Sequence, residues 1–465
     1  MQGTKQMAND RMISDRLAAF ADGLEQSQIP PEVWRRAKLL TLDAIGAAYA
    51  ASNCDFAQKT RAALSALGSG EAQVIGMPVK LALRDAVMLN SVMVHGLDYD
   101  DTYLPGSVHL TASCVPTALG MAAHAGASGR DFMLATLLGL EIDARLGLAG
   151  NGGFLRAGFH ATSILGTFAC ALIAGKLLKL DRKQLAMAQG IALSTASGNM
   201  QPMEDGSWTK RMHPGWAAAG GITAAMLARE GFVGPKAPYE GRFGLYPCFL
   251  GKHAAAANPQ SVDDEIGKRW EFIRSSVKLF PACHQAHAFM NATLKLSRAH
   301  AIDPDQVESI HALIAEPAVP LICEPLESKR KPDSSYGAQF SLPYAIACCL
   351  KRGRFGLPEL EESAYTDPAL RALAQRMTYA IDPDPGFPKF RSGEVHIKMK
   401  NGVEYKCREQ VVPDEPAPEA AIVEKFMNNA QLCMPAARAE KISGMILNVE
   451  TLDNTRALAA QLAGE

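Results

Sequence analysis

Residues 95–124, which read HGLDYDDTYLPGSVHLTASCVPTALGMAAH, concentrate side chains that can move protons. Within it, three aspartates, Asp98, Asp100 and Asp101, lie between the two histidines His95 and His109. A Pro-Gly pair predicts a loop, and the small apolar residues that follow predict a buried helix. Carboxylates and a histidine placed where a loop enters a helix can form an acid–base site. An exposed loop with capping aspartates explains the same stretch, so the other motifs must decide between the two.

Two further stretches add a histidine and a group of cations. His160 immediately precedes a run of small apolar residues, where a histidine more often starts a helix or packs than catalyses. Lys210, Arg211 and His213 come just before a helix that the pattern starts near Pro214. A helix N-terminus offers unpaired N–H groups and partial positive charge, so this stretch predicts a carboxylate or phosphate site. A solvated basic turn is the alternative, and the apolar neighbours disfavour it.

The second half of the chain holds two smaller candidates. The stretch VKLFPACHQAHAF carries Lys278, Cys283, His284 and His287. These residues could form the zinc site of a hydrolase, but a second pair of zinc ligands is missing nearby. Cys283 could also act as a nucleophile with His284, but no residue that would orient the histidine is evident. We therefore expect Lys278 to bind a substrate carboxylate. Tyr336, in PDSSYGAQF, is a candidate proton donor or an aromatic plug between domains.

Composition narrows the classes of protein and of chemistry. The chain of 465 residues is 48% hydrophobic and carries a net charge of −1, which predicts a globular protein of two domains and disfavours nucleic acid or an anionic membrane as partner. Ten scattered cysteines without a C-x-x-C pair, and no apolar run of membrane-spanning length, predict a reduced cytoplasmic setting. Nucleotide-binding fingerprints are missing, so we expect chemistry on side chains alone, without metal or cofactor.

The elements that must position these residues are mostly helices. Apolar, alanine- and glycine-rich periodicity predicts helices from residue 15 to about 250, and such helices must be buried against one another. The clearest begin at Pro31 and after the N-cap Ser128, and others cover 160–178, 183–199 and 214–231. After residue 265 the pattern favours strands at 270–277 and 307–315, and a hairpin turning at Asn401-Gly402. Helices are expected at 341–350 and 367–378.

These patterns predict a mainly α protein in which the chain leaves a helical domain and later returns to it. The first part of the helical domain covers 1–269, an α+β domain covers 270–412, and the C-terminal return covers 413–465, beginning with the proline-rich link PDEPAPEA.

Taken together, the motifs resemble those of the MmgE/PrpD family. The matching stretches are HGLDYDDTYLPGSVHLTASC and its continuation, GFHATSILGTFACA, KRMHPGWAAAGG, KLFPACHQAH and AQFSLPYAIA, in the family's order. The resemblance implies a helical domain formed from both chain ends, an inserted α+β lid, and homodimers. The family includes 2-methylcitrate dehydratase, cis-aconitate decarboxylase and iminodisuccinate epimerase, which act on small polycarboxylates.

Carried onto this chain, the resemblance assigns the site to Asp98, His109, His160, Lys210 and Lys278. Methylcitrate dehydratases carry a D-H-S or D-H-C sequence where this chain has 339–341, Gln-Phe-Ser, which argues against methylcitrate.

The shared chemistry moves a proton at a carbon next to a carboxylate. Such a reaction needs cations on the carboxylate, here Lys210 and Lys278, and an imidazole on the carbon, here His109 or His160. We expect an epimerase of the iminodisuccinate type. The alternative is a lyase, either a dehydratase or a decarboxylase, and a more distant one is a non-catalytic binding protein.

Overall fold

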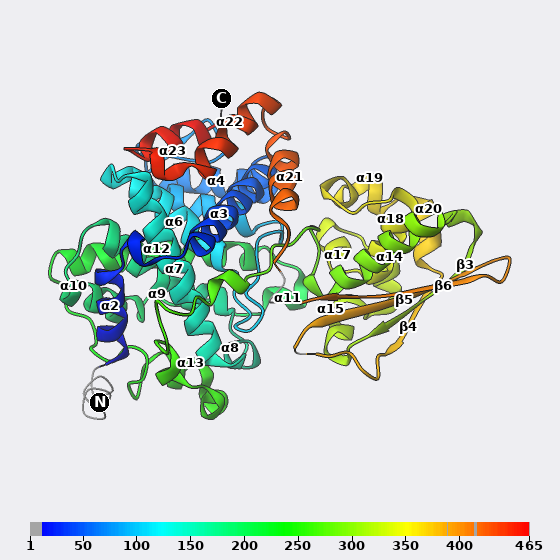
Figure 1. The fold of residues 1–465 in the computed structure, drawn as a ribbon, viewed down its shortest axis with the longest axis horizontal. Helices are drawn as coiled ribbons and strands as arrows, with labels where there is room; N and C mark the ends of the chain where they lie inside the picture. Colours follow the sequence, from blue (N-terminus) through cyan, green and yellow to red (C-terminus); the bar gives the residue numbers. More distant parts are fainter. Residues whose placement is uncertain (1–11, 388, 413–415, 465) are drawn as a thin grey trace. The chain divides into compact units, whose positions relative to one another are not determined.

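The computed structural model describes residues 12–387, 389–412 and 416–464. The chain divides into two compact units, unit 1 of residues 1–277 and 416–465 and unit 2 of residues 278–415. Helices dominate the described residues, as the sequence predicts (Figure 1). None of these helices is both long enough and apolar enough to cross a lipid bilayer.

Among the described residues of unit 1, helices are accompanied by one two-stranded ribbon, in which β1 and β2 pair antiparallel. Its elements are α2 (Ile13–Gly23), α3 (Pro31–Ala51), α4 (Asp55–Leu67), β1 (Ala72–Gln73), β2 (Lys80–Leu81), α5 (Leu83–His95), α6 (Leu110–Ala125), α7 (Gly129–Gly150), α8 (Gly153–Arg156), α9 (Ala161–Leu177), α10 (Arg182–Ala192), α11 (Pro202–Asp205), α12 (Thr209–Arg229), α13 (Leu245–Leu250), α21 (Glu419–Ala430), α22 (Ala436–Leu447) and α23 (Arg456–Leu462).

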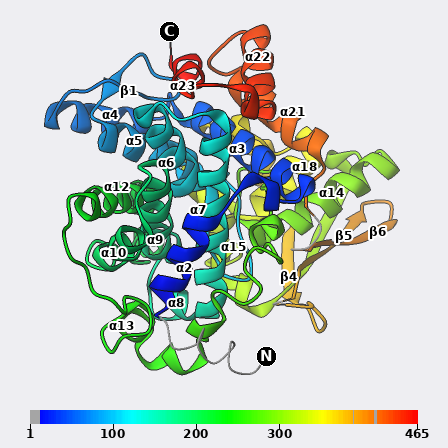
Figure 2. The ribbon, with the colours of Figure 1, turned by 60° about the vertical axis from the view of Figure 1, so that its left-hand side comes forward.

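The centre of unit 1 is α9, which packs against α6, α7, α10 and α12 (Figure 2). Nearly every residue of α9 is buried, as its uniformly apolar sequence predicts. Small residues set the spacing: a Cβ on Gly221 of α12 would lie 2.5 Å from the Cβ of Cys170 on α9. The close approach of α9 and α12 therefore depends on glycine, and it brings the first turns of both helices toward one place.

The returning C-terminal segment holds the loop that carries the aspartates. Helix α21 packs on α3 (Figure 1), and the buried Lys425 of α21 lies 2.6 Å from the Asp43 carboxylate of α3. Lys425 also donates a hydrogen bond of 2.7 Å to the Tyr99 carbonyl, in the loop after α5. Burial raises the pKa of Asp43 to about 6 although the Lys425 ammonium opposes the shift. The two ends of the chain thus fix the base of this loop.

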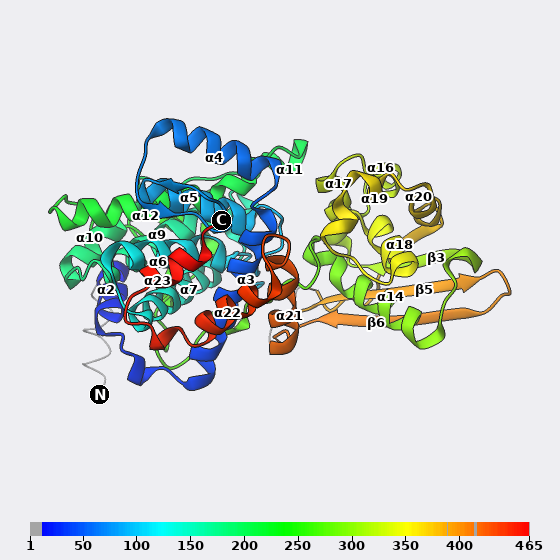
Figure 3. The same ribbon diagram turned by 90° about the horizontal axis from the view of Figure 1, so that it is seen from above.

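Unit 2 is built on a four-stranded sheet of order β4-β3-β5-β6, in which β3 and β4 are parallel and the other pairs antiparallel. Helix α14 covers β5 and β6 (Figure 3), and a Cβ on Gly393 of β5 would lie 2.7 Å from the backbone nitrogen of Phe289 on α14. The elements are α14 (His287–His300), β3 (Val307–Ile314), α15 (Val319–Ile322), α16 (Leu326–Arg330), α17 (Ser335–Gln339), α18 (Leu342–Arg352), α19 (Glu362–Tyr365), α20 (Pro368–Ala374), β4 (Met377–Ile381), β5 (Arg391–Met399) and β6 (Glu404–Val411).

Several sequence-based element predictions are confirmed. Helices begin at Pro31 and after the N-cap Ser128, whose hydroxyl accepts from the Asp131 backbone, and α18 follows Ser341. The strand predicted at 307–315 is β3, and the predicted hairpin is β5–β6. The proline-rich link falls partly on residues 413–415, which lie outside the described residues.

Four local predictions are wrong. The stretch 270–277 is a 3₁₀ turn and loop instead of a strand, joined to Thr102 by a single bridge at Ser276. The hairpin turn is not type I′, which needs positive φ at both central residues; Gly402 has φ +84° but Asn401 does not. Helix α10 stops at residue 192, and the helix predicted at 367–378 ends at 374 because β4 follows.

Candidate active site

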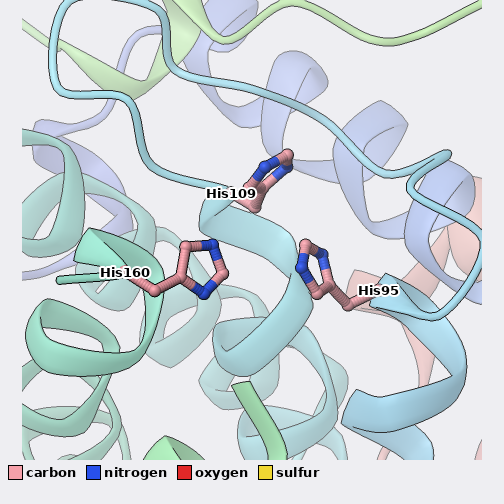
Figure 4. Close-up of side chains that lie close together, drawn as sticks. All are labelled: His95, His109 and His160. Atoms are coloured by element: carbon pink, nitrogen blue, oxygen red, sulfur yellow. The ribbon is translucent and has the colours of Figure 1, made fainter. Parts of the chain in front are cut away.

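Three histidines converge where three helices of unit 1 end or begin. His95 is the last residue of α5, His109 the N-cap of α6 and His160 the N-cap of α9. The ring centroids are 4.7 Å apart for His95–His109, 5.5 Å for His95–His160 and 6.1 Å for His109–His160. Figure 4 shows the rings grouped around the N-terminal turn of α6. Neither N-cap imidazole bonds the backbone of its own helix, so both rings are directed to the cluster instead.

His95 is held from both sides by charged groups. Its Nδ1 lies 2.8 Å from the Oδ2 of the fully buried Asp100, and its Nε2 lies 3.2 Å from the Nζ of Lys210. A carboxylate accepts and an ammonium donates, so Nδ1 carries the proton and Nε2 the lone pair. His95 is therefore a neutral imidazole of fixed tautomer, fastened between an anion and a cation.

Lys210 is paired before any substrate arrives. Its Nζ donates to Asp98 Oδ1 at 2.9 Å as well as to His95, and only about a tenth of either charged side chain in the Lys210–Asp98 pair is exposed. Asp98 reaches this position from a turn with φ +51°, in the left-handed region that aspartate tolerates better than most residues. An ammonium has three N–H groups, so one remains to bind a ligand.

The helix that carries Lys210 begins earlier than the sequence predicted. Helix α12 starts at Thr209, and Pro214 lies inside it, so Lys210 and Arg211 belong to the first turn. Arg211 does not join the histidine cluster: its guanidinium lies 4.6 Å from the ring centroid of Phe56. The predicted helix start at Pro214 is wrong, because a proline inside the helix was taken for its first residue. That Arg211 takes part in binding an anion stays a prediction.

His109 is oriented by the backbone of the acidic loop. Its Nδ1 lies 2.8 Å from the Asp101 carbonyl oxygen and 3.5 Å from Asp100 Oδ1. A carbonyl only accepts, so Nδ1 carries a proton and Nε2 is the nitrogen that can exchange one. The Asp101 carboxylate accepts bonds from the Thr111 backbone and hydroxyl and from the Ser275 hydroxyl, and it thereby caps α6.

His160 and His213 form a buried imidazole pair. Their Nδ1 atoms are 3.0 Å apart, so one ring donates to the other. Burial, and then the positive charge of Lys210, lowers the pKa of His160 well below its usual value and that of His213 to about 4. Both rings are neutral at neutral pH, which suits a base or a metal ligand and does not suit a resident acid.

The structure brings together most, but not all, of the residues predicted from the sequence. The residues found in one cluster are Asp98, His109, His160, Lys210 and His213. Lys278 and Tyr336 belong to unit 2, Lys278 buried and Tyr336 with its ring centroid 4.8 Å from that of Phe340, and their part in a site stays a prediction.

Two residues of the cluster were named in the acidic stretch by the sequence analysis but were not assigned to the site. His95 and Asp100 lie at its centre, and Asp100, not Asp98, is the carboxylate 3.5 Å from His109. The spacing of Asp98 and Asp100 could have indicated that Asp100 also belongs to the site, because residues two apart in an extended loop often project in the same direction.

The same residues contain the groups that are suited to hold a metal ion. Within the described chain, His95, His109 and His160 form one such group, and His95, Asp98 and Asp100 form another. Cys283, His284 and His287, from which a zinc hydrolase was considered, do not appear among these groups.

Fold and site together define a mainly helical protein with a buried cluster of imidazoles, carboxylates and one ammonium. The chain belongs to the MmgE/PrpD family: the family's N-terminal domain matches residues 15–257 and its C-terminal domain matches residues 280–451. It is similar to the cis-aconitate decarboxylase-like protein oryM of Aspergillus oryzae, with 26% identity over 97% of this chain and 98% of that protein. It is also similar to the cis-aconitate decarboxylase of Aspergillus terreus, with 26% identity over 97% of this chain and 96% of that protein. The cis-aconitate decarboxylase of Homo sapiens is likewise 26% identical, over 98% of this chain and 95% of that protein.

Proposed function

We propose that the protein is a lyase that removes CO₂ from a small unsaturated tricarboxylate such as cis-aconitate, without metal or organic cofactor. The three similar proteins reported above are named cis-aconitate decarboxylases or a cis-aconitate decarboxylase-like protein, and this favours the lyase alternative over the epimerase that the sequence analysis preferred. The observation that carries the proposal is the arrangement of His109 beside Asp100, with Lys210 nearby.

Decarboxylation needs a place for an electron pair and a source of one proton. When the C–C bond to the leaving carboxylate breaks, CO₂ departs and its bonding pair stays on the substrate, spread over the double bond toward a remaining carboxylate. The third N–H of Lys210 binds that carboxylate and stabilises its growing charge. A C–H bond then forms with a proton from a general acid, and the net change consumes one proton per CO₂ released.

His109 is the proposed acid. The Asp101 carbonyl fixes Nδ1–H, so a proton on Nε2 is the one that can be given to carbon. The negative charge of Asp100, 3.5 Å from Nδ1, stabilises the imidazolium form. His160, kept neutral by burial and by Lys210, takes no such part and instead lines the site as a neutral acceptor. The sequence-based roles of Lys278 as a cation for the substrate and of Tyr336 as a phenolic donor stay predictions.

The proposal is tested by product analysis in D₂O. Purified protein is incubated with cis-aconitate, citrate, methylcitrate or iminodisuccinate, and products are followed by NMR with trapping of CO₂. We expect CO₂ from cis-aconitate and one deuterium on the product carbon. Water loss instead would establish a dehydratase, deuterium exchange with change of optical rotation and no CO₂ would establish an epimerase, and inertness toward all four would favour the non-catalytic alternative.

A pair of variants ties the chemistry to the cluster. His109→Asn removes the acid and should reduce turnover by ~10²–10⁴-fold. His124→Asn changes an exposed histidine at the other end of α6 and should leave turnover unchanged.

A further inference from the structure

The three helix-end histidines have a second chemical capacity that the proposed proton transfer does not use. Each of His95, His109 and His160 offers one ring nitrogen, and these nitrogens lie within 4.8 Å of one another. Neutral imidazole nitrogen is a preferred ligand of Zn²⁺, which binds at ~2.0–2.1 Å in tetrahedral geometry. Two ligand nitrogens in such a site are ~3.4 Å apart, so the rings need to approach by at most ~1.5 Å.

The opposite nitrogen of each ring is already fixed in the manner of a metal site. Nδ1 of His95 donates to the Asp100 carboxylate, Nδ1 of His109 donates to the Asp101 carbonyl, and Nδ1 of His160 bonds to His213. Histidines that bind metals characteristically donate their second N–H to a carboxylate or carbonyl, which sets the tautomer and aims the other nitrogen. In all three rings Nδ1 is engaged in this way, so Nε2 is the nitrogen that would bind a metal ion.

The Lys210 ammonium already contacts a nitrogen that a metal ion in this cluster would bind. This ammonium donates to the Nε2 lone pair of His95 and to Asp98. A metal ion bound to that Nε2 needs the same lone pair, so ammonium and metal exclude each other there. When the ammonium leaves, Asp98 is released as a further carboxylate, and His95, Asp98 and Asp100 are themselves grouped closely enough to share an ion.

We propose that His95, His109 and His160 bind a single Zn²⁺-type ion in competition with the Lys210 ammonium. Asp98 and Asp100 supply the negative charge that balances the ion. Binding consumes the Nε2 lone pairs of His95 and His109, so the ion blocks any reaction that requires these nitrogens. The inference stands apart from the proposed decarboxylase, because binding is measured without turnover.

The test is a titration of the full chain, treated with a chelator and then dialysed, with Zn²⁺ by calorimetry and with Co²⁺ by visible absorption. We expect one ion per chain, with the absorption of a tetrahedral nitrogen- and oxygen-ligated Co²⁺ and no near-ultraviolet thiolate band. His109→Asn should weaken binding by more than ~100-fold, and Asp100→Asn, which removes an orienting partner, by ~10–100-fold. His124→Asn, an exposed histidine, should change nothing.

Lys210→Met is the decisive variant, because a gain of affinity cannot arise from misfolding. Removal of the competing ammonium should tighten Zn²⁺ binding by at least ~10-fold, since the ion no longer displaces an ion pair. The proposal is overturned if Lys210→Met weakens binding or leaves it unchanged, if His109→Asn binds like the parent protein, or if Co²⁺ gives thiolate bands from one of the ten cysteines.

Discussion

His213 should make unit 1 sensitive to acid, by an amount that its surroundings determine. The residue is 5% exposed, and burial followed by the charge of Lys210 lowers the pKa of its imidazole from 6.5 to about 4. In the unfolded chain the ring regains its usual pKa and binds the proton more readily than in the folded state. Stability from this group is therefore complete above pH 6.5 and falls as the pH drops from 6.5 toward 4.

The size of the effect follows from the two pKa values. With 6.5 in the unfolded chain and about 4 in the folded protein, linkage lowers the free energy of unfolding by ~2 kcal/mol at pH 5 and by under ~0.1 kcal/mol at pH 7.5. Replacement with glutamine removes the titration. Between pH 7.5 and pH 5, the free energy of unfolding of the parent protein should thus fall by ~2 kcal/mol more than that of His213→Gln. A constant change in stability caused by the substitution does not affect this difference.

Urea unfolding followed by tryptophan fluorescence measures this difference. All four tryptophans belong to unit 1, so the signal reports the unit that contains His213; they are Trp34, Trp208, Trp216 and Trp270. His124→Gln, at an exposed position, is the matched control and should follow the parent protein at both pH values. Equal acid losses in the parent and in His213→Gln would refute the assignment of a buried neutral imidazole to this position.

Three further perturbations probe other parts of unit 1. Lys210→Met should lower kcat/KM for the carboxylate substrate by ~10²–10³-fold in steady-state assays, because the substrate loses its charged donor, and Lys210→Arg should restore part of it. Asp101→Ala should cost on the order of 3 kcal/mol in urea unfolding, because Thr111 and the start of α6 lose their buried acceptor. Gly221→Leu should destabilise unit 1 by ~1–3 kcal/mol or more in the same assay, since its side chain would meet α9, whereas Gly444→Ala has open space and should be neutral or slightly stabilising.

Much of the secondary structure was predictable because it depends on residues close in sequence. The apolar run of α9, the N-cap Ser128 and the proline at the start of α3 each act within one or two helical turns. The predictions of secondary structure were wrong where a residue type is compatible with two different local structures. Proline starts some helices and lies inside others, and Asn-Gly permits more than one turn; the surrounding contacts decide which.

The sequence by itself determined which side chains of the candidate site are able to carry out the chemistry and that they lie near helix starts: His109, His160 and Lys210. Only the tertiary structure decided their partners. Lys210 and His95 are 115 positions apart in sequence, and no local pattern encodes a hydrogen bond between them. The packing of α9 against α12 across Gly221 brings the starts of these two helices together. The fold of the loop after α5 sets the direction of each carboxylate and places Asp100 beside His109.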